Sequence, residues 1–161
     1  MDKKDQTLTL TMITEPKHAN IFGNVHGGEI MRLMDTTAGC TAIKYSKKTC
    51  VAARVDEFQF LKPIHIGSLI KSTGKIVYTG NTSIEIRVTV DVENLIEDNS
   101  SYRAIEAFFT YVALNEEGRP TPVPSYKPET EREIELHNYV KQRREFDLQR
   151  REEARAKKGN P

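Results

Sequence analysis

Apolar and polar residues alternate with two different periods along this chain, and these periods predict its elements. Residues 7–14 alternate with period two, which is typical of a strand with one buried face. From residue 29 to residue 45 the period lengthens to that of a helix with one apolar face. This face consists of Ile30, Leu33, Met34, Thr37, Ala38, Thr41 and Tyr45. The side chains on the helix become smaller toward Ala38 and Ala42, so another surface can approach it closely.

Period-two alternation returns after the helix and predicts four more strands. The first, over residues 51–60, changes parity near Asp56-Glu57, which indicates a bulge that redirects the strand. The next covers residues 68–79 and leads into a tight turn at Gly80-Asn81. Because the four strands are joined by short turns, we expect them to form an antiparallel sheet.

The last two strands differ in how much of their surface they bury. One face of residues 84–93 is apolar and points inward, with Ile84, Ile86, Val88, Val90 and Val92. We expect the other face to point outward, with Glu85, Arg87, Thr89, Asp91 and Glu93. A turn at residues 98–101 leads into residues 102–114, which are apolar on both parities and should lie centrally, covered on both faces. A sheet wrapped around one long helix buries both patterns, so the fold class is α+β.

The C-terminal part of the chain has a different composition. Four prolines (Pro120, Pro122, Pro124 and Pro128) predict an extended connector over residues 119–129. Thr130 and Glu133 fit a capping box, so a helix should begin there. We therefore expect one domain over residues 7–118, then this connector, then a charged C-terminal helix and tail over residues 130–161.

Composition and charge exclude several classes of protein. The 161 residues suit one domain. Because the residues from 130 onward are rich in charged side chains, the folded core is smaller than the chain, and a small core often gains stability from association, so we expect an oligomer. A net charge of +1 argues against nucleic acid as a partner. The N-terminus has no apolar signal region and no segment is long enough to span a membrane, so we expect a cytoplasmic protein without a membrane partner. The cysteines lack metal-ligand spacing and the four histidines are scattered, so no metal site is predicted.

The segment Asn24-Val25-His26-Gly27-Gly28 stands where the long helix begins. The first N–H groups of a helix lack intrahelical partners, and the helix dipole adds partial positive charge there. A ligand oxygen could reach the N–H groups of Gly27 and Gly28, which would stabilise an oxyanion. The two glycines could equally well serve only the turn and close packing. Asn24 could hold a water or a carbonyl, or simply shape the loop. For His26 we favour a structural role over contact with substrate.

Asp35 is the candidate general base. It lies two helical turns further on, on the shoulder of the apolar face beside Met31 and Ala42 and next to Gly39. A carboxylate flanked by methionine and small residues, where a second subunit could cover it, is suited to accept a proton. An aspartate in such a position could also be an ordinary surface residue. Other schemes fit poorly: the chain has no Gly-x-Ser-x-Gly elbow, phosphate-binding glycine loop or dinucleotide fingerprint.

These motifs resemble a known family. Residues 24–35, Asn-Val-His-Gly-Gly-Glu-Ile-Met-Arg-Leu-Met-Asp, followed by Ala38-Gly39, resemble the signature of the cytosolic acyl-CoA thioesterases of hotdog fold. Residues 55–64 are similar to the second strand of that family, and residues 80–83 to its third hairpin. The resemblance covers roughly residues 7–114 and keeps the order of elements.

The resemblance implies a sheet wrapped around a long helix, dimers whose sheets join edge to edge, and further assembly as a trimer of dimers, that is, a hexamer. It implies a fatty acyl-CoA hydrolase that needs no metal or redox cofactor, with an active site between subunits. Asp35 matches the catalytic aspartate and Asn24 the catalytic asparagine, while the N–H groups of Gly27 and Gly28 match the helix terminus that polarises the thioester. Candidates for contact with coenzyme A are Arg54, Lys62, Thr82 and Ser83.

Two alternatives stay open. The first is a non-catalytic acyl-CoA-binding or sensing module on the same fold, which retention of both Asn24 and Asp35 disfavours. The second is a hotdog dehydratase, which would need a histidine placed beside an acid on the helix. His26 is too close to the helix start for that. The sequence leaves the preferred acyl-chain length and any nucleotide regulation open.

Overall fold

The computed structural model describes residues 6–95 and 101–158, and the chain divides into two compact units, residues 1–125 and 126–161. The first unit contains β1 (Thr7–Ile13), a short 3-10 helix (Pro16–His18), α1 (Gly27–Ser46), β2 (Thr49–Phe60), β3 (Leu69–Thr79), β4 (Ser83–Glu93) and β5 (Tyr102–Leu114). The second contains α2 (Glu131–Lys158). The predicted turn at residues 98–101 falls mostly, and the tail at residues 159–161 entirely, outside the described residues.

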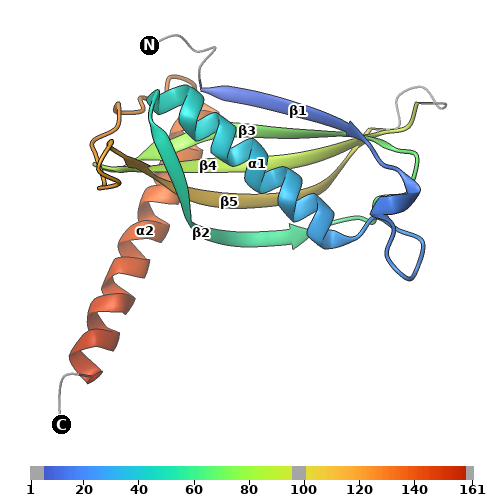
Figure 1. Ribbon diagram of the computed structural model, residues 1–161. Coiled ribbons are helices and arrows are strands. Elements are labelled where there is room, and N and C mark those ends of the chain that lie inside the picture. The colour runs from blue at the N-terminus through green and yellow to red at the C-terminus, as the bar shows by residue number, and fades with distance from the viewer. Residues whose placement is uncertain (1–5, 96–100, 159–161) are drawn as a thin grey trace. The chain divides into compact units, whose positions relative to one another are not determined.

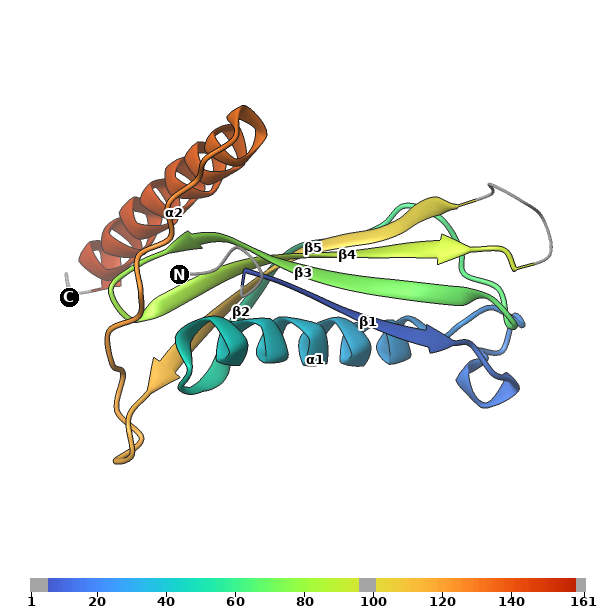
Figure 2. The ribbon, with the colours of Figure 1, turned by 90° about the horizontal axis from the view of Figure 1, so that it is seen from above.

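The five strands form one antiparallel sheet in the order β1-β3-β4-β5-β2, and α1 lies along one face of it (Figures 1 and 2). This confirms the α+β arrangement, with β1 and β2 as edge strands. The apolar face of α1 packs on the sheet, where Ile30, Met34, Ala38 and Ala42 are buried. The buried threonines of this face are satisfied too, since Thr37 Oγ1 bonds Ser72 Oγ of β3 at 2.8 Å.

Helix α1 begins two residues earlier than the hydrophobic period indicated. His26 is its N-cap, and the side-chain Nδ1 accepts the N–H of Gly28 at 3.0 Å. The glycine pair therefore forms the first helical turn rather than a turn before the helix. Lys47 closes the other end in the left-handed conformation, with its N–H bonded to Ile43 O at 2.8 Å.

The parity change in residues 51–60 is a bulge, as predicted. The pairing of β2 with β5 shifts register between Ala52 and Arg54 and again between Asp56 and Gln59. Glu57, inside the second shift, has a φ of 51°. The extra residue turns the end of β2, so that Phe60 and the residues after it reach the N-terminal end of α1.

One expectation about β4 is wrong. Glu85 was predicted to point outward, but its side chain is completely buried and its Oε1 accepts a hydrogen bond from Thr110 Oγ1 at 2.8 Å. Thr89 on the same face is buried as well. Alternation shows which residues of a strand share a face, but it does not show whether that face is covered. The face of β4 that points away from α1 is covered at Glu85 and Thr89. The expectation that β5 is buried on both parities is confirmed, and β5 is an interior strand between β4 and β2, although the middle strand of the five is β4.

The second unit begins inside the segment that was predicted as a connector. Its helix α2 starts with the predicted capping box: the Glu133 N–H donates to Thr130 Oγ1 at 3.3 Å, and the Thr130 N–H donates to Glu133 Oε2 at 3.1 Å. Within residues 6–95 and 101–158, no helix is both long and apolar enough to cross a membrane.

Candidate active site

A tight loop leads into α1 and holds two asparagines in fixed positions. The Asn20 side-chain Oδ1 accepts the N–H of Phe22 at 2.9 Å and that of Asn24 at 3.2 Å. The backbone adds two bonds, from Asn20 N–H to Asn24 O at 2.7 Å and from Gly23 N–H to Asn20 O at 3.1 Å. Because Oδ1 of Asn20 is occupied by the loop itself, the remaining polar group of that side chain is the Nδ2 donor.

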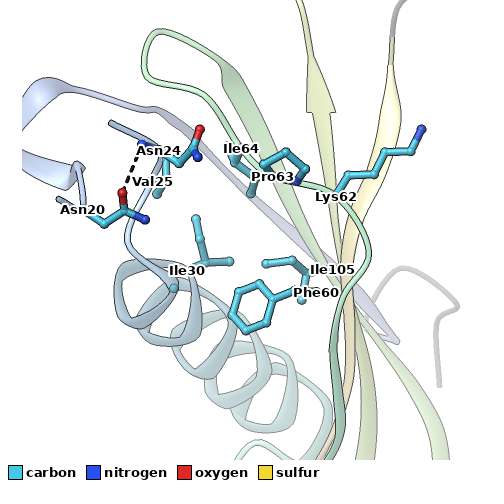
Figure 3. Close-up of a pocket in the computed structure, with 10 residues that line it drawn as sticks. Asn20, Asn24, Val25, Ile30, Phe60, Lys62, Pro63, Ile64 and Ile105 are labelled. Carbon is cyan, nitrogen blue, oxygen red and sulfur yellow. Dashed lines mark hydrogen bonds between the residues drawn. The ribbon is translucent and has the colours of Figure 1, made fainter. Parts of the chain in front are cut away.

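A pocket of about 270 Å³ lies between this loop, the first turn of α1 and the end of β2 (Figure 3). Most of its wall is apolar, from Val25, Ile30, Phe60, Pro63, Ile64 and Ile105. Its polar residues are Asn20, Asn24 and Lys62, of which the Lys62 side chain extends away from the pocket (Figure 3), and Gly27 borders it from the helix. An apolar pocket with a few convergent donors is the usual form of a small-molecule site. We call Asn20, Asn24 and Gly27 the amide half-site.

The two helix amides predicted to act together have different surroundings. The Gly28 N–H is bonded to His26 Nδ1, so that bond would have to open before Gly28 could bind a ligand. Gly27, as the first residue of α1, has an N–H with no intrahelical acceptor, and the residue lines the pocket. A Cβ on Gly27 would lie 2.9 Å from Cζ of Phe60, so glycine is what lets that ring close over the helix terminus. His26 takes the capping role that we favoured for it.

Asp35 is exposed on α1, eight residues beyond Gly27, and it does not line the pocket. Eight residues of helix correspond to about 12 Å along the axis. Its partner is the hydroxyl of Tyr111 on β5, which lies 2.7 Å from Asp35 Oδ1 and 2.9 Å from Asp35 O. We call Asp35 and Tyr111 the carboxylate half-site. Within one chain, the two half-sites cannot both contact a single carbonyl group.

The four residues predicted to contact coenzyme A divide between these places. Lys62 lies at the pocket, with Nζ 5.2 Å from the centre of the Tyr102 ring. Arg54 pairs in the sheet with Thr110, next to Tyr111, and its Nε is 2.6 Å from Asp56 Oδ2. Thr82 ends the β3–β4 turn, and Ser83 begins β4, where it pairs with Val112 of β5. Arg54, Thr82 and Ser83 therefore lie at the level of the carboxylate half-site, and Lys62 lies with the amide half-site.

Sequence reasoning missed Asn20 and Tyr111. The spacing of Asn20 and Asn24 around Gly23 is typical of a side-chain-closed turn and could have indicated the first. Nothing local could have indicated the second, because Tyr111 meets Asp35 across 76 positions of sequence. No cluster of three or more metal-ligating side chains occurs in the part of the chain that the structure describes.

The Thioesterase superfamily matches this sequence over residues 22–97. The cytosolic acyl coenzyme A thioester hydrolase of Rattus norvegicus is 43% identical over 126 residues, which is 78% of this chain and 33% of the rat protein. The chain thus spans about a third of the length of that relative. An acyl-CoA thioester hydrolase of Salmonella typhimurium is 32% identical over 127 residues, which is 77% of this chain and 96% of that protein.

Solved structures agree over nearly the whole chain. An apo-hexameric acyl-CoA thioesterase superposes with a TM-score of 0.87 at 30% identity, covering 93% of this chain and 96% of that one. An acyl-CoA hydrolase of Staphylococcus aureus, solved with butyryl coenzyme A, coenzyme A and coenzyme A disulfide, superposes with a TM-score of 0.85 at 28% identity, covering 96% and 94%.

Two further structures of the Staphylococcus aureus enzyme carry alanine in place of one asparagine and of one aspartate. These two positions are fifteen residues apart in that chain. Asn20 precedes Asp35 by the same fifteen residues, whereas Asn24 precedes it by eleven.

Proposed function

We propose that this chain, which belongs to the thioesterase superfamily and has its hotdog fold, hydrolyses fatty acyl-CoA to a free fatty acid and coenzyme A. The observation that carries the proposal is the amide half-site. There a helix N–H without an intrahelical acceptor and two asparagine carboxamides, of which that of Asn20 is held by the loop, border an apolar pocket. The relatives of this chain are named acyl-CoA thioester hydrolases. Such donors suit the oxygen of a thioester, which gains negative charge when its carbonyl carbon is attacked.

The chemistry needs a carboxylate beside these donors. Asp35 would take a proton from a water molecule as that water attacks the carbonyl carbon, or its oxygen would attack directly and form an anhydride that water then hydrolyses. In both cases the carbon–sulfur bond breaks and coenzyme A leaves as a thiolate that takes up a proton. Neither route calls for a metal or a redox cofactor.

We propose that the two half-sites meet between subunits, so that Asp35 of one copy faces the amide half-site of another. Three observations support this. Gly27 and Asp35 of one chain are about 12 Å apart along the axis of α1. Apolar side chains beside the carboxylate half-site are uncovered, with Met31 on α1 44% exposed and Val51 and Val55 on β2 44% and 41% exposed. β2 is also an edge strand that can extend its sheet with that of a second copy.

The solved relative named hexameric supports further assembly, which we propose to be a trimer of such dimers. In this arrangement Lys62 from one copy, with Arg54, Thr82 and Ser83 from the other, would lie around the bound coenzyme A. The rat relative is named cytosolic, and we propose the cytoplasm for this protein too.

Two asparagines at the pocket, Asn20 and Asn24, could donate a side-chain hydrogen bond to the thioester oxygen. The family resemblance assigned this role to Asn24, but two observations favour Asn20. The loop holds Asn20 Oδ1, which fixes Nδ2. Asn20 also precedes Asp35 by the same number of residues as separates the altered asparagine and aspartate of the Staphylococcus aureus enzyme. We therefore propose Asn20 as the side-chain donor to the thioester, with Asn24 shaping the loop through its backbone bonds.

Asn20→Asp separates the two functions of Asn20, because it keeps an oxygen for the loop and loses the Nδ2 donor. We expect kcat to fall about 10²- to 10³-fold, the usual effect of removing one oxyanion donor. Asn24→Asp is the matched control, with an expected change of less than about tenfold. Steady-state thiol release measures both. The reverse ranking would return the role to Asn24, and two unaffected variants would remove the asparagines from the mechanism.

The reaction itself is tested by thiol release from acyl-CoAs running from acetyl to palmitoyl. Turnover that depends on chain length would support the hydrolase and define its fatty acyl range. The remaining alternative is an acyl-CoA-binding module. It would be favoured if the intact protein bound these acyl-CoAs and released no thiol from any of them.

A further inference from the structure

Tyr111 is an unusual residue for the buried face of β5, because its hydroxyl reaches an exposed catalytic candidate. The strand pairs it with Ala52 of β2 and Ile84 of β4, and its side chain is only 5% exposed. The ring packs beneath α1, where a Cβ on Gly39 would lie 3.2 Å from Oη. Glycine at this position leaves the space through which the hydroxyl reaches the preceding turn of the helix.

The hydroxyl contacts two atoms of one residue. Oη lies 2.7 Å from Asp35 Oδ1 and 2.9 Å from Asp35 O, so its single hydrogen is shared between the carboxylate and a helix carbonyl. Burial, and then the bond to Asp35, raise the pKa of Tyr111 well above that of a free tyrosine. The hydroxyl therefore stays protonated at neutral pH and acts as a hydrogen-bond donor to Asp35.

Asp35 is otherwise exposed, and an exposed aspartate samples several side-chain rotamers. A bond that holds Oδ1 and the backbone of the same residue restricts both side-chain torsions. The second oxygen, Oδ2, is then held in one orientation and is left for other partners.

We propose that Tyr111 is a positioning residue of the thioesterase reaction, which holds Oδ1 of Asp35 so that Oδ2 is presented to water or to the thioester carbon. This inference rests on the proposed catalytic role of Asp35. Tyr111 itself touches neither substrate nor the reacting atoms. It acts through the carboxylate, in the way that fixed geometry around a reacting group raises kcat.

Tyr111→Phe removes the hydroxyl and keeps the ring. We expect kcat for acyl-CoA hydrolysis by the intact protein to fall about 10- to 100-fold, because misplacement of a reacting group by an ångström has effects of this size. KM should change less than about twofold, since no contact with substrate is lost. An unchanged kcat would overturn the inference.

Tyr45→Phe is the matched control. Tyr45 is also buried, lies on α1, and donates its hydroxyl to a backbone carbonyl, Pro124 O, at 3.1 Å. It has no link to Asp35, so both variants should lose similar thermal stability while only Tyr111→Phe loses kcat. Equal loss of kcat in both would mean that a buried hydroxyl matters only for the fold, and would overturn the positioning role.

The double variant with Asp35→Asn separates this inference from the function that it rests on. If Tyr111 acts through Asp35, adding Tyr111→Phe to Asp35→Asn should lower the residual kcat less than twofold. A further full-size loss would show that Tyr111 acts elsewhere and would overturn the inference. Should Asp35→Asn alone leave kcat unchanged, the proposed role of Asp35 fails first, and the positioning role fails with it.

Discussion

Replacing Asp35 by asparagine is expected to lower kcat for acyl-CoA hydrolysis by about 10³-fold or more, the range seen when a catalytic base or nucleophile is removed. Asparagine has the shape of aspartate and its oxygen can still accept the Tyr111 hydroxyl, so the half-site should keep its geometry. What is lost is the ability to take a proton or to attack a carbonyl. Steady-state thiol release and thermal unfolding together measure the effect.

Asp91→Asn is a suitable control for this change. Asp91 lies on β4 and accepts two bonds from Arg103, at 2.9 and 3.1 Å, so the variant loses a carboxylate charge and weakens an ion pair outside both half-sites. Its kcat should stay within about twofold of that of the wild type. If Asp35→Asn keeps kcat near the control, Asp35 is neither base nor nucleophile.

Phe109→Ala is expected to lower the free energy of unfolding by about 3–5 kcal/mol. The ring is 2% exposed and lies on β5 between Ile86 of β4 and Val55 of β2, so its removal leaves a cavity that interior strands can hardly close. The parallel variant Phe146→Ala, in a residue of α2 that is 60% exposed, should cost less than about 0.5 kcal/mol.

Urea unfolding, compared at one protein concentration because assembly adds stability, measures this difference. A loss below about 1 kcal/mol for Phe109→Ala would show that this interior strand is not tightly packed at Phe109.

Much of the fold follows from local pattern. Alternation located all five strands, and the helical period located α1, since each element buries one face against the rest. The parity change at Asp56-Glu57 gave the bulge, and Thr130 with Glu133 gave the start of α2. Each of these signals lies within a few residues of the feature that it predicts.

The burial of Glu85 could not be predicted from the local pattern of residues. A glutamate between two isoleucines is expected on the outward face of an alternating strand, and Glu85 does lie on the face of β4 that points away from α1. Whether that face is exposed depends on the position of β4 in the sheet and on what covers it, and neither is encoded in the strand itself. The start of α1 was missed for a related reason. Gly27 and Gly28, which follow the N-cap His26, have no side chains and so add nothing to a hydrophobic period.

Part of the candidate site could likewise be predicted from local sequence and part could not. Asn24, Gly27 and Lys62 were singled out from sequence, and the structure gathers them at one pocket. The contact of Asp35 with Tyr111, and the bond that occupies the Gly28 N–H, depend on side-chain placement in three dimensions. The separation of Gly27 from Asp35, by contrast, follows from helical spacing, and it supports the proposed site between subunits.

Subunit mixing tests that central claim most directly. Chains carrying Asp35→Asn and chains carrying Asn20→Asp, each nearly inactive alone, are dissociated, combined in equal amounts and reassembled, with distinguishable tags to verify that mixed oligomers form. In a mixed dimer one site carries both changes and the other carries neither, so random pairing should restore about a quarter of wild-type kcat. Mixed oligomers that stay as inactive as their parents would contradict an active site shared between two copies of this chain.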